Sequence, residues 1–292
     1  MTAHDRVSES GTHGIRRLVR QSIAAAVQSL GRGPLSDTAV HSLRKSLKRA
    51  RALLRLLRAA IGDEAYRREN DALRDAARGF SQVRDSKVLL DTVEALIAHH
   101  RHDDELHRAL RRDRVAARHE LESSGSRIAA TRQTLQSAYR RADRWHTDDG
   151  GWLALGTGLR HVYSRGREAL RHARADGAPE SFHEWRKQTK YLWHQLQALE
   201  TLRPGTIGDL DDRAHTLSDL LGDDHNLTVL RARMERAELA EAVRSRLAGR
   251  IDSRQRSLRR RARGLGEQIY REAPAVFEAR MARRWHGKRR RG

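Results

Sequence analysis

The stretch His-Ser-Leu-Arg-Lys-Ser-Leu-Lys-Arg-Ala-Arg-Ala-Leu-Leu-Arg-Leu-Leu-Arg, residues 41–58, decides how this chain folds. Its apolar side chains recur at steps of three and four residues, which predicts one buried stripe along an α-helix. This stripe comprises Val40, Leu43, Leu47, Ala50, Leu54, Leu57 and Ile61. Ser36 or Asp37 is the predicted N-cap of the helix, and Gly62 is its predicted stop.

The same stretch contains seven Lys or Arg residues and no acidic residue. Its cations follow the apolar rhythm one position later, so they form a second stripe about 100° round the helix. This first basic stripe comprises His41, Arg44, Lys48, Arg51, Arg55 and Arg58. Like charges at spacing four repel, and an extended polyanion would remove that penalty. For one such helix, a solvated basic face remains an equal alternative.

A second copy of the pattern favours the polyanion. Residues 183–190, His-Glu-Trp-Arg-Lys-Gln-Thr-Lys, repeat the His, Arg, Lys and Lys of residues 41–48 on the same steps. The apolar stripe beside them comprises Phe182, Trp185, Thr189, Leu192, Leu196 and Leu199. Segments 81–85 and 222–226 also correspond, and an apolar run follows each. The chain therefore looks like an internal duplication.

The ordered pair of His-x-x-Arg-Lys-x-x-Lys helices, each followed by a segment such as Val83-Arg84-Asp85 or Gly222-Asp223-Asp224-His225-Asn226, resembles the CHAD family, the conserved-histidine α-helical domain. The resemblance covers residues 14–275. It implies two four-helix bundles related by a pseudo-two-fold axis, a basic surface or channel between them, and binding of inorganic polyphosphate, often at polyphosphate granules. Granule proteins are then further expected partners.

The second copy departs from the first. Trp193, Gln197 and Glu200 stand where the first copy has Arg51, Arg55 and Arg58. The second basic stripe is therefore shorter, and the two halves need not contribute equally.

Long segments rich in Ala, Leu and Arg, with only four Pro, predict an all-α protein. We expect a first half over 14–146 and a second over 151–275, divided at 147–151. Extra charged helices are expected at 103–122 and 126–142, and their sparse apolar positions predict peripheral packing. The other predicted helices span 15–30, 64–79, about 86–99, 152–175, a segment from 180 or 181, 207–221, 225–247 and 250–272. The basic tail, 276–292, is expected to be frayed.

Composition limits the partners. The chain has 292 residues and a formal net charge of +21, which favours polyphosphate, nucleic acid or an anionic membrane as partner. The absence of Cys excludes disulfides and thiolate metal sites. No run of 18 apolar residues occurs, and the polar start does not look like a signal peptide. We therefore expect a cytoplasmic protein that is associated with polyphosphate granules and not with membranes.

The expected anion contacts come from both basic stripes, because guanidinium and ammonium groups donate charge-assisted hydrogen bonds to phosphate. The main candidates are Arg44, Lys48, Arg51, Arg55, Arg186 and Lys190. Lys45, Arg49 and Lys187 lie further round their helices, where they either bind the anion or only solvate the surface. Additional basic residues that could widen the surface are Arg74, Arg78, Arg160 and Arg167.

His41 and His183 each open a basic helix. Each could donate a hydrogen bond to a phosphate oxygen, bind a metal, or cap and pack. Metal is disfavoured because the neighbouring Lys and Arg residues repel a metal ion. A looser metal candidate, better explained as a solvated helix end, comprises His99, His100, His102 and His107. We expect neither a metal nor a cofactor.

Catalytic motifs are missing from the sequence, which contains no Gly-rich phosphate loop, His-Glu-x-x-His or Gly-x-Ser-x-Gly. Asp209, Asp211, Asp212 and the pair 223–224 are interpreted as helix-start residues. The sequence thus predicts non-enzymatic binding of polyphosphate. Nonspecific binding of duplex nucleic acid is one alternative, since an aromatic content of 4% leaves few platforms for stacking single strands. A scaffold that docks an acidic protein is another.

Overall fold

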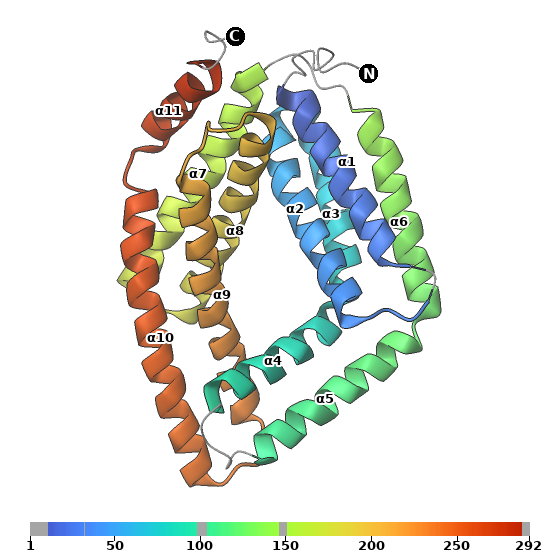
Figure 1. Ribbon diagram of the computed structural model, residues 1–292, viewed down its shortest axis with the longest axis vertical. Coiled ribbons are helices and arrows are strands. Elements are labelled where there is room, and N and C mark those ends of the chain that lie inside the picture. The colour runs from blue at the N-terminus through green and yellow to red at the C-terminus, as the bar shows by residue number, and fades with distance from the viewer. Residues whose placement is uncertain (1–10, 32, 98–103, 146–150, 288–292) are drawn as a thin grey trace.

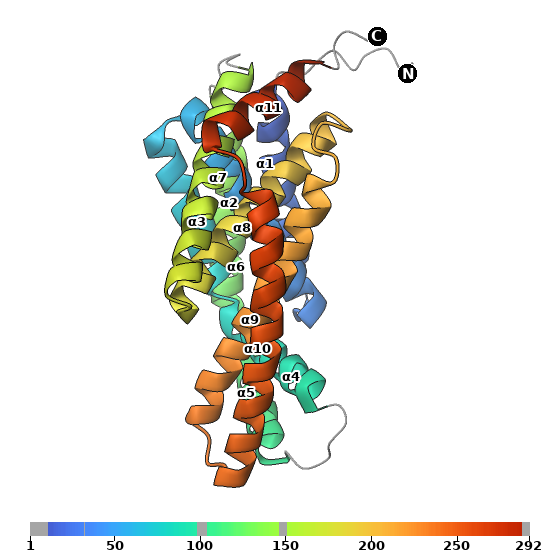
Figure 2. The same ribbon diagram turned by 90° about the vertical axis from the view of Figure 1, so that its left-hand side faces the viewer.

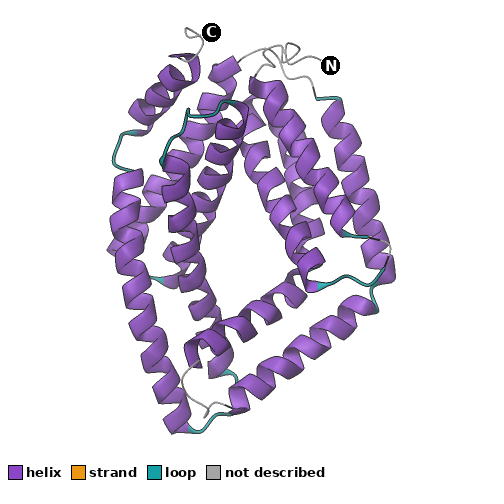
Figure 3. Ribbon diagram, in the orientation of Figure 1, coloured by secondary structure: helices purple, strands orange, loops and turns teal. Residues whose placement is uncertain are grey.

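The computed structural model describes residues 11–31, 33–97, 104–145 and 151–287. Within these ranges the chain forms helices and no strand, which confirms the all-α prediction (Figure 3). The helices are α1 (Gly11–Ser29), α2 (Asp37–Ile61), α3 (Asp63–Arg78), α4 (Ser81–Ile97), α5 (Asp104–Glu122), α6 (Gly125–Asp143), α7 (Gly151–Ala175), α8 (Pro179–Leu202), α9 (Leu210–Glu235), α10 (Glu241–Ile269) and α11 (Pro274–Gly287).

Helices α1, α2, α3 and α6 form one bundle (Figure 1). The predicted apolar stripe of α2 is buried here from Val40 to Leu57, while Ile61 at its end is partly exposed. Helix α6 was expected to be peripheral, and that prediction is wrong. It packs on α1 and α3 through Leu135, Ala138 and Ala142, whose spacing of three and four residues makes a narrow but continuous apolar stripe.

Helices α7, α8, α9 and α10 form a second bundle, in which α8 packs between α7 and α9 (Figure 1). Helices α9 and α10 continue through residues 222–225 and 247–250, where the sequence predicted that one helix ends and the next begins. Gly222 and Gly249 lie inside these helices, at positions where an added Cβ would meet nothing. Apolar stripes continue on both sides of each glycine, and this burial outweighs the cost of about 1 kcal/mol for a glycine in a helix.

The expected frayed tail is instead helix α11 up to Gly287, and residues 288–292 lie outside the described chain. Phe277, Met281 and Trp285 repeat every four residues and are buried against α7. Phe277 stacks on Tyr163 with ring centroids 3.9 Å apart. A short apolar stripe within a basic segment is therefore enough to hold this helix on the second bundle.

Helices α4 and α5 connect the two bundles at the end away from the termini (Figures 1 and 2). Helix α4 packs on α5 and on α9. It begins at Ser81, before the predicted start after Asp85, because the turn between α3 and α4 takes only Gly79 and the buried Phe80. Arg84 and Asp85 therefore lie in the first turns of α4, where Asp85 Oδ1 is 3.9 Å from Arg44 Nη2.

The two bundles meet where α2 packs on α7 and α8. The backbones approach closely at Gly158 of α7, where an added Cβ would lie 2.5 Å from the Leu56 carbonyl oxygen. Gln195 Nε2 of α8 donates a hydrogen bond to Ala52 O over 3.0 Å. Two faces of α2 are consequently covered, and Ala52, Leu53 and Leu56 are buried in addition to the predicted stripe. None of the described helices is long and apolar enough to span a bilayer.

Candidate anion-binding cleft

A cleft of about 820 Å³ lies between the two bundles, with walls from α2, α4, α8 and α9. Both His-x-x-Arg motifs open into it. The predicted contacts that line the cleft are His41, Arg44, Lys45, Lys48, His183, Arg186 and Lys190. The two basic stripes therefore converge on a shared space, although they are far apart in the sequence.

Helix α2 places its basic residues through its own cap and core. The Ser36 side chain accepts a hydrogen bond from Ala39 N over 3.1 Å and fixes the first turn. The buried stripe then turns the adjacent basic face toward the cleft. Arg44 is held there by its Nη1, which donates to Ala77 O over 2.8 Å and to Ser81 Oγ over 2.7 Å.

Helix α8 is positioned in the same way. Pro179 occupies its first turn, and Phe182, Trp185 and Thr189 are buried in the second bundle. His183 and Arg186 lie on the neighbouring face, which lines the cleft. Arg186 and Lys190 follow His183 at spacings of three and four residues, so all three lie on this face of the helix.

Helix α9 supplies the wall opposite α2. His225 lies beside His183, with the two Nδ1 atoms 3.4 Å apart and the ring centroids 4.8 Å apart. Asp219 and Asp223 also line the cleft. The neighbouring Asp224 is buried, and Arg259 Nε of α10 donates to its Oδ1 over 2.7 Å. Asp223 and Asp224 are therefore mid-helix residues, unlike Asp211 and Asp212, which do lie in the first turn of α9.

The cleft contains more cations than its carboxylates neutralise. In the described ranges, no carboxylate oxygen lies within 4.0 Å of Lys48, Arg186 or Lys190, and Arg44 has only Asp85 at 3.9 Å. Burial, followed by the charges of Arg44, Arg186 and Lys190, lowers the pKa of Lys48 to about 7. Burial also lowers the pKa of Arg186 and of Lys190. Partly desolvated positive charges held in this way favour an anionic ligand.

His41, His183 and His225 in the cleft are neutral near pH 7. Burial, then the charges of Arg186, His183 and Lys48, lowers the pKa of His225 to about 4. Burial is also the main cause that lowers the pKa of His41 and of His183. A neutral imidazole still donates one N–H hydrogen bond, so these rings can contact phosphate oxygens without adding charge.

Four of the predicted contacts lie elsewhere. Arg51 Nε donates to Asn70 Oδ1 of α3 over 3.2 Å. Arg55 stacks 3.9 Å above the Tyr191 ring and donates to Arg51 O over 2.7 Å. Lys187 is exposed and forms an ion pair with Glu184 of its own helix. Arg49 lines a neighbouring pocket.

The C-terminal part of the first basic stripe thus turns away from the cleft. The cause is tertiary packing. Helices α3 and α8 pack against this part of α2, and their side chains bind its guanidinium groups. Arg74 is bonded to Asp71 and Asp75, and Arg78 is paired with Asp75 at 3.9 Å. Arg160 and Arg167 are exposed on α7 and do not line the cleft.

Several residues that line the cleft were not predicted from the sequence, among them His194, His215 and Trp193. A signal for His194 was present, since it follows His183 by eleven residues, which is three helical turns. No comparable signal exists for His215, whose ring stacks on Trp193 at 4.3 Å and comes from another helix. Such contacts depend on how α9 packs on α8.

The histidine cluster that was considered as a looser metal candidate lies only partly within the described residues. His99, His100 and His102 lie outside it, and His107 Nε2 lies 3.1 Å from Glu94 Oε1. Among the residues that the structure describes, no group of three or more His, Asp or Glu side chains could hold a metal ion.

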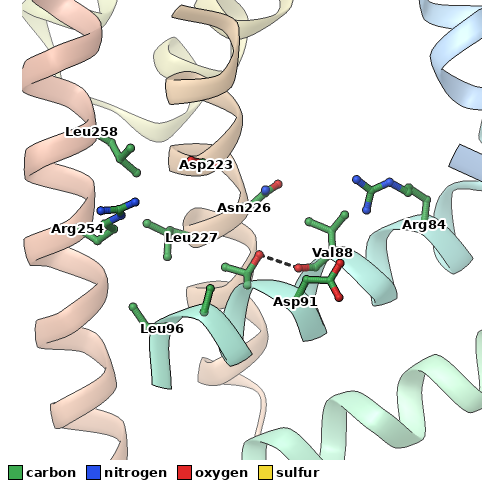
Figure 4. A pocket seen from close by; sticks show the side chains of 11 residues that line it. Arg84, Val88, Asp91, Leu96, Asp223, Asn226, Leu227, Arg254 and Leu258 are labelled. Carbon is green, nitrogen blue, oxygen red and sulfur yellow. Dashed lines mark hydrogen bonds between the residues drawn. The ribbon is translucent and has the colours of Figure 1, made fainter. Parts of the chain in front are cut away.

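A second pocket of about 520 Å³ adjoins the cleft between α4, α9 and α10 (Figure 4). It shares Arg84 and Asn226 with the cleft, and Arg254 of α10 lies at its far side (Figure 4). Leu227 and Leu258 give it an apolar floor, and Asp91 and Asp223 offset the positive charge. This pocket is therefore less suited to an anion than the cleft.

Comparisons with known proteins agree with this architecture. The model of the CHAD domain family matches residues 15–235. A structure described as PptA from Streptomyces chartreusis superposes with a TM-score of 0.65 at 16% identity and covers 91% of this chain and 100% of its own. The crystal structure of the CHAD domain from the plant Ricinus communis gives a TM-score of 0.61 at 16% identity, with 94% and 92% covered. No curated protein matches.

The chain belongs to the CHAD domain family, as the two histidine motifs predicted. This family is associated with polyphosphate binding. The similarity to the two structures extends over nearly the whole chain and, at this level of identity, establishes the shared all-α fold.

Proposed function

We propose that this protein binds inorganic polyphosphate in the cleft between its two bundles and does not hydrolyse it. The observation that carries the proposal is the convergence of seven basic or histidine side chains, from two motifs 142 residues apart, on one cleft with few carboxylates. A chain of phosphates offers repeated oxyanions to such a cleft. Association with polyphosphate granules would follow from this binding.

The alternatives fit the cleft less well. Duplex nucleic acid has grooves about 12 and 6 Å wide and presents its phosphates on the outside of a broad rod. It would therefore meet the mouth of the cleft and leave Lys48 and Arg186 without phosphate contacts. An acidic protein segment would have to enter as an extended chain.

The test compares two adjacent residues of α8. Arg186→Gln removes a cation that lines the cleft, whereas Lys187→Gln removes an exposed cation that is paired with Glu184. A charge-assisted hydrogen bond is worth about 1.5–3 kcal/mol, so Arg186→Gln should weaken binding of long-chain polyphosphate about tenfold or more. Lys187→Gln should change the affinity less than threefold, about 0.7 kcal/mol.

Calorimetric titration of both variants gives the comparison. Equal affinities in the two variants would mean that the cleft is not the binding site. Displacement of polyphosphate by duplex DNA at equal phosphate concentration would favour the nucleic-acid alternative. Retention of a protein partner from cells that lack polyphosphate would favour the scaffold.

A further inference from the structure

A side pocket of about 450 Å³ adjoins the cleft between α2, α8 and α9. The pocket shares Lys45, His194 and His215 with the cleft, so the two spaces are neighbours. Its hydrogen-bond donors come mainly from α2 and α8: Ser42, Lys45, Ser46, Arg49, His194 and Gln197.

Arg49 has a buried donor without a partner. Its Nε is inaccessible to solvent and makes no hydrogen bond within the described chain. Burial lowers the pKa of Arg49, and no carboxylate offsets this effect. A guanidinium remains charged in proteins, so a buried positive N–H group lies beside the pocket with no acceptor.

His194 is the second unpartnered group. Its side chain is 2% exposed, and neither Nδ1 nor Nε2 has a hydrogen-bond partner in the described chain. Burial, followed by the charges of Lys190, Arg49 and Lys48, lowers its pKa to about 3. The ring is therefore neutral, with one N–H available as a donor at the wall of the pocket. Buried polar groups are rarely left unpaired in the state that functions.

The charges around the pocket select an anion. None of the described residues that line it is an Asp or Glu, whereas Asp85, Asp219 and Asp223 line the cleft. Lys45 and Arg49 would repel a metal ion. The two serine hydroxyls and the Gln197 amide add neutral donors, so the lining offers donors from several directions to one tetrahedral oxyanion.

We propose that the side pocket is a second phosphate subsite, which takes phosphate groups of the same polyphosphate chain that occupies the cleft. This inference rests on the proposed function. Lys45 and His194 line both spaces, and the chain would extend past them from one space into the other. A ligand too short to reach from one space to the other should occupy the cleft, because the cleft contains more cations. Arg49 then contributes to the binding of long chains only.

The experiment compares long-chain polyphosphate with tripolyphosphate in calorimetric titrations of the full chain. In Arg49→Gln, the affinity for the long chain should fall at least tenfold, while the affinity for tripolyphosphate should stay within twofold of the original. Lys48→Gln should weaken both ligands and leave their ratio unchanged. Arg160→Gln, which removes an exposed cation of α7 outside both spaces, should change neither affinity.

Each outcome decides between the two proposals. An unchanged ratio of affinities in Arg49→Gln overturns the side pocket and leaves the function intact. Absence of binding by the original protein overturns the function itself. Ser46→Ala keeps all charges and serves if Arg49→Gln unfolds. It should lower the same ratio by about threefold, and an unchanged ratio in this variant also counts against the subsite.

Discussion

Lys48 links the cleft to pH. Its pKa is lowered to about 7 from an ordinary value of 10.5, mainly by burial. At a pH between these two pKa values, Lys48 is protonated in the unfolded chain and mostly deprotonated in the folded chain. The contribution of Lys48 to the free energy of unfolding therefore rises as the pH increases through this window. Without a bound ligand, the folded protein disfavours the charged form of Lys48 relative to the unfolded chain.

A bound polyanion should reverse that preference and raise the pKa of Lys48. We therefore expect binding at pH 8 to take up protons from the solution. In calorimetry the uptake appears as a heat of binding that depends on the ionisation enthalpy of the buffer. Lys48→Gln should lose most of this dependence, whereas Lys187→Gln should keep it. Equal proton uptake by the two variants would contradict the assignment of the shifted group to Lys48.

The basic residues of α2 differ in how well the sequence predicted their positions. His41, Arg44 and Lys48 lie where the helical spacing put them, because one helix presents all three. Arg51 and Arg55 continue the same spacing and yet bind Asn70 and Tyr191. Spacing along one helix sets the relative direction of side chains, but it does not tell which neighbouring helix covers them.

Helix α2 is the element that joins the molecule, since it packs in the first bundle on one face and against α7 and α8 on another. Gly158 permits a close approach of α7 to α2 at this junction. Helix α2 also lines the cleft, so a shift at the junction would move its basic residues relative to those of α8.

Two glycine substitutions test this junction. Gly158→Ala places a Cβ 2.5 Å from Leu56 O, so the backbones must separate, at an expected cost of about 1–3 kcal/mol. Gly249→Ala in α10 meets open space and should stabilise the protein by up to about 1 kcal/mol, because alanine favours helix. Urea unfolding measures both values. A neutral Gly158→Ala would show that the two bundles do not require this approach.

At the scale of the whole molecule, the cleft exists only because both bundles are present. Its walls come from α2 and α4 on one side and from α8 and α9 on the other. A ligand that contacts both sides binds the folded state alone, and it therefore stabilises the whole molecule through mass action.

We expect long-chain polyphosphate at about 100 times its Kd to increase the free energy of unfolding by about 2.7 kcal/mol. The increase should shrink steeply as salt is raised, because counterions released from the polyanion drive binding. Thermal unfolding with and without polyphosphate at several salt concentrations checks this. An increase that persists unchanged in high salt would point to binding that does not depend on the cations of the cleft.

The sequence by itself determined the helices with strong apolar periods, a cap at Ser36 or Asp37, the stop at Gly62, the CHAD family and a set of motif side chains of which seven line the cleft. Only the tertiary structure decided that α9 continues through Gly222, that α11 packs on α7, and that Arg51 and Arg55 turn to α3 and α8. The physical reason is the distance along the chain over which each kind of interaction acts. Periodicity and capping act within one helix, whereas the cover over a helix face comes from residues distant in the chain, whose burial outweighs local signals such as a single glycine.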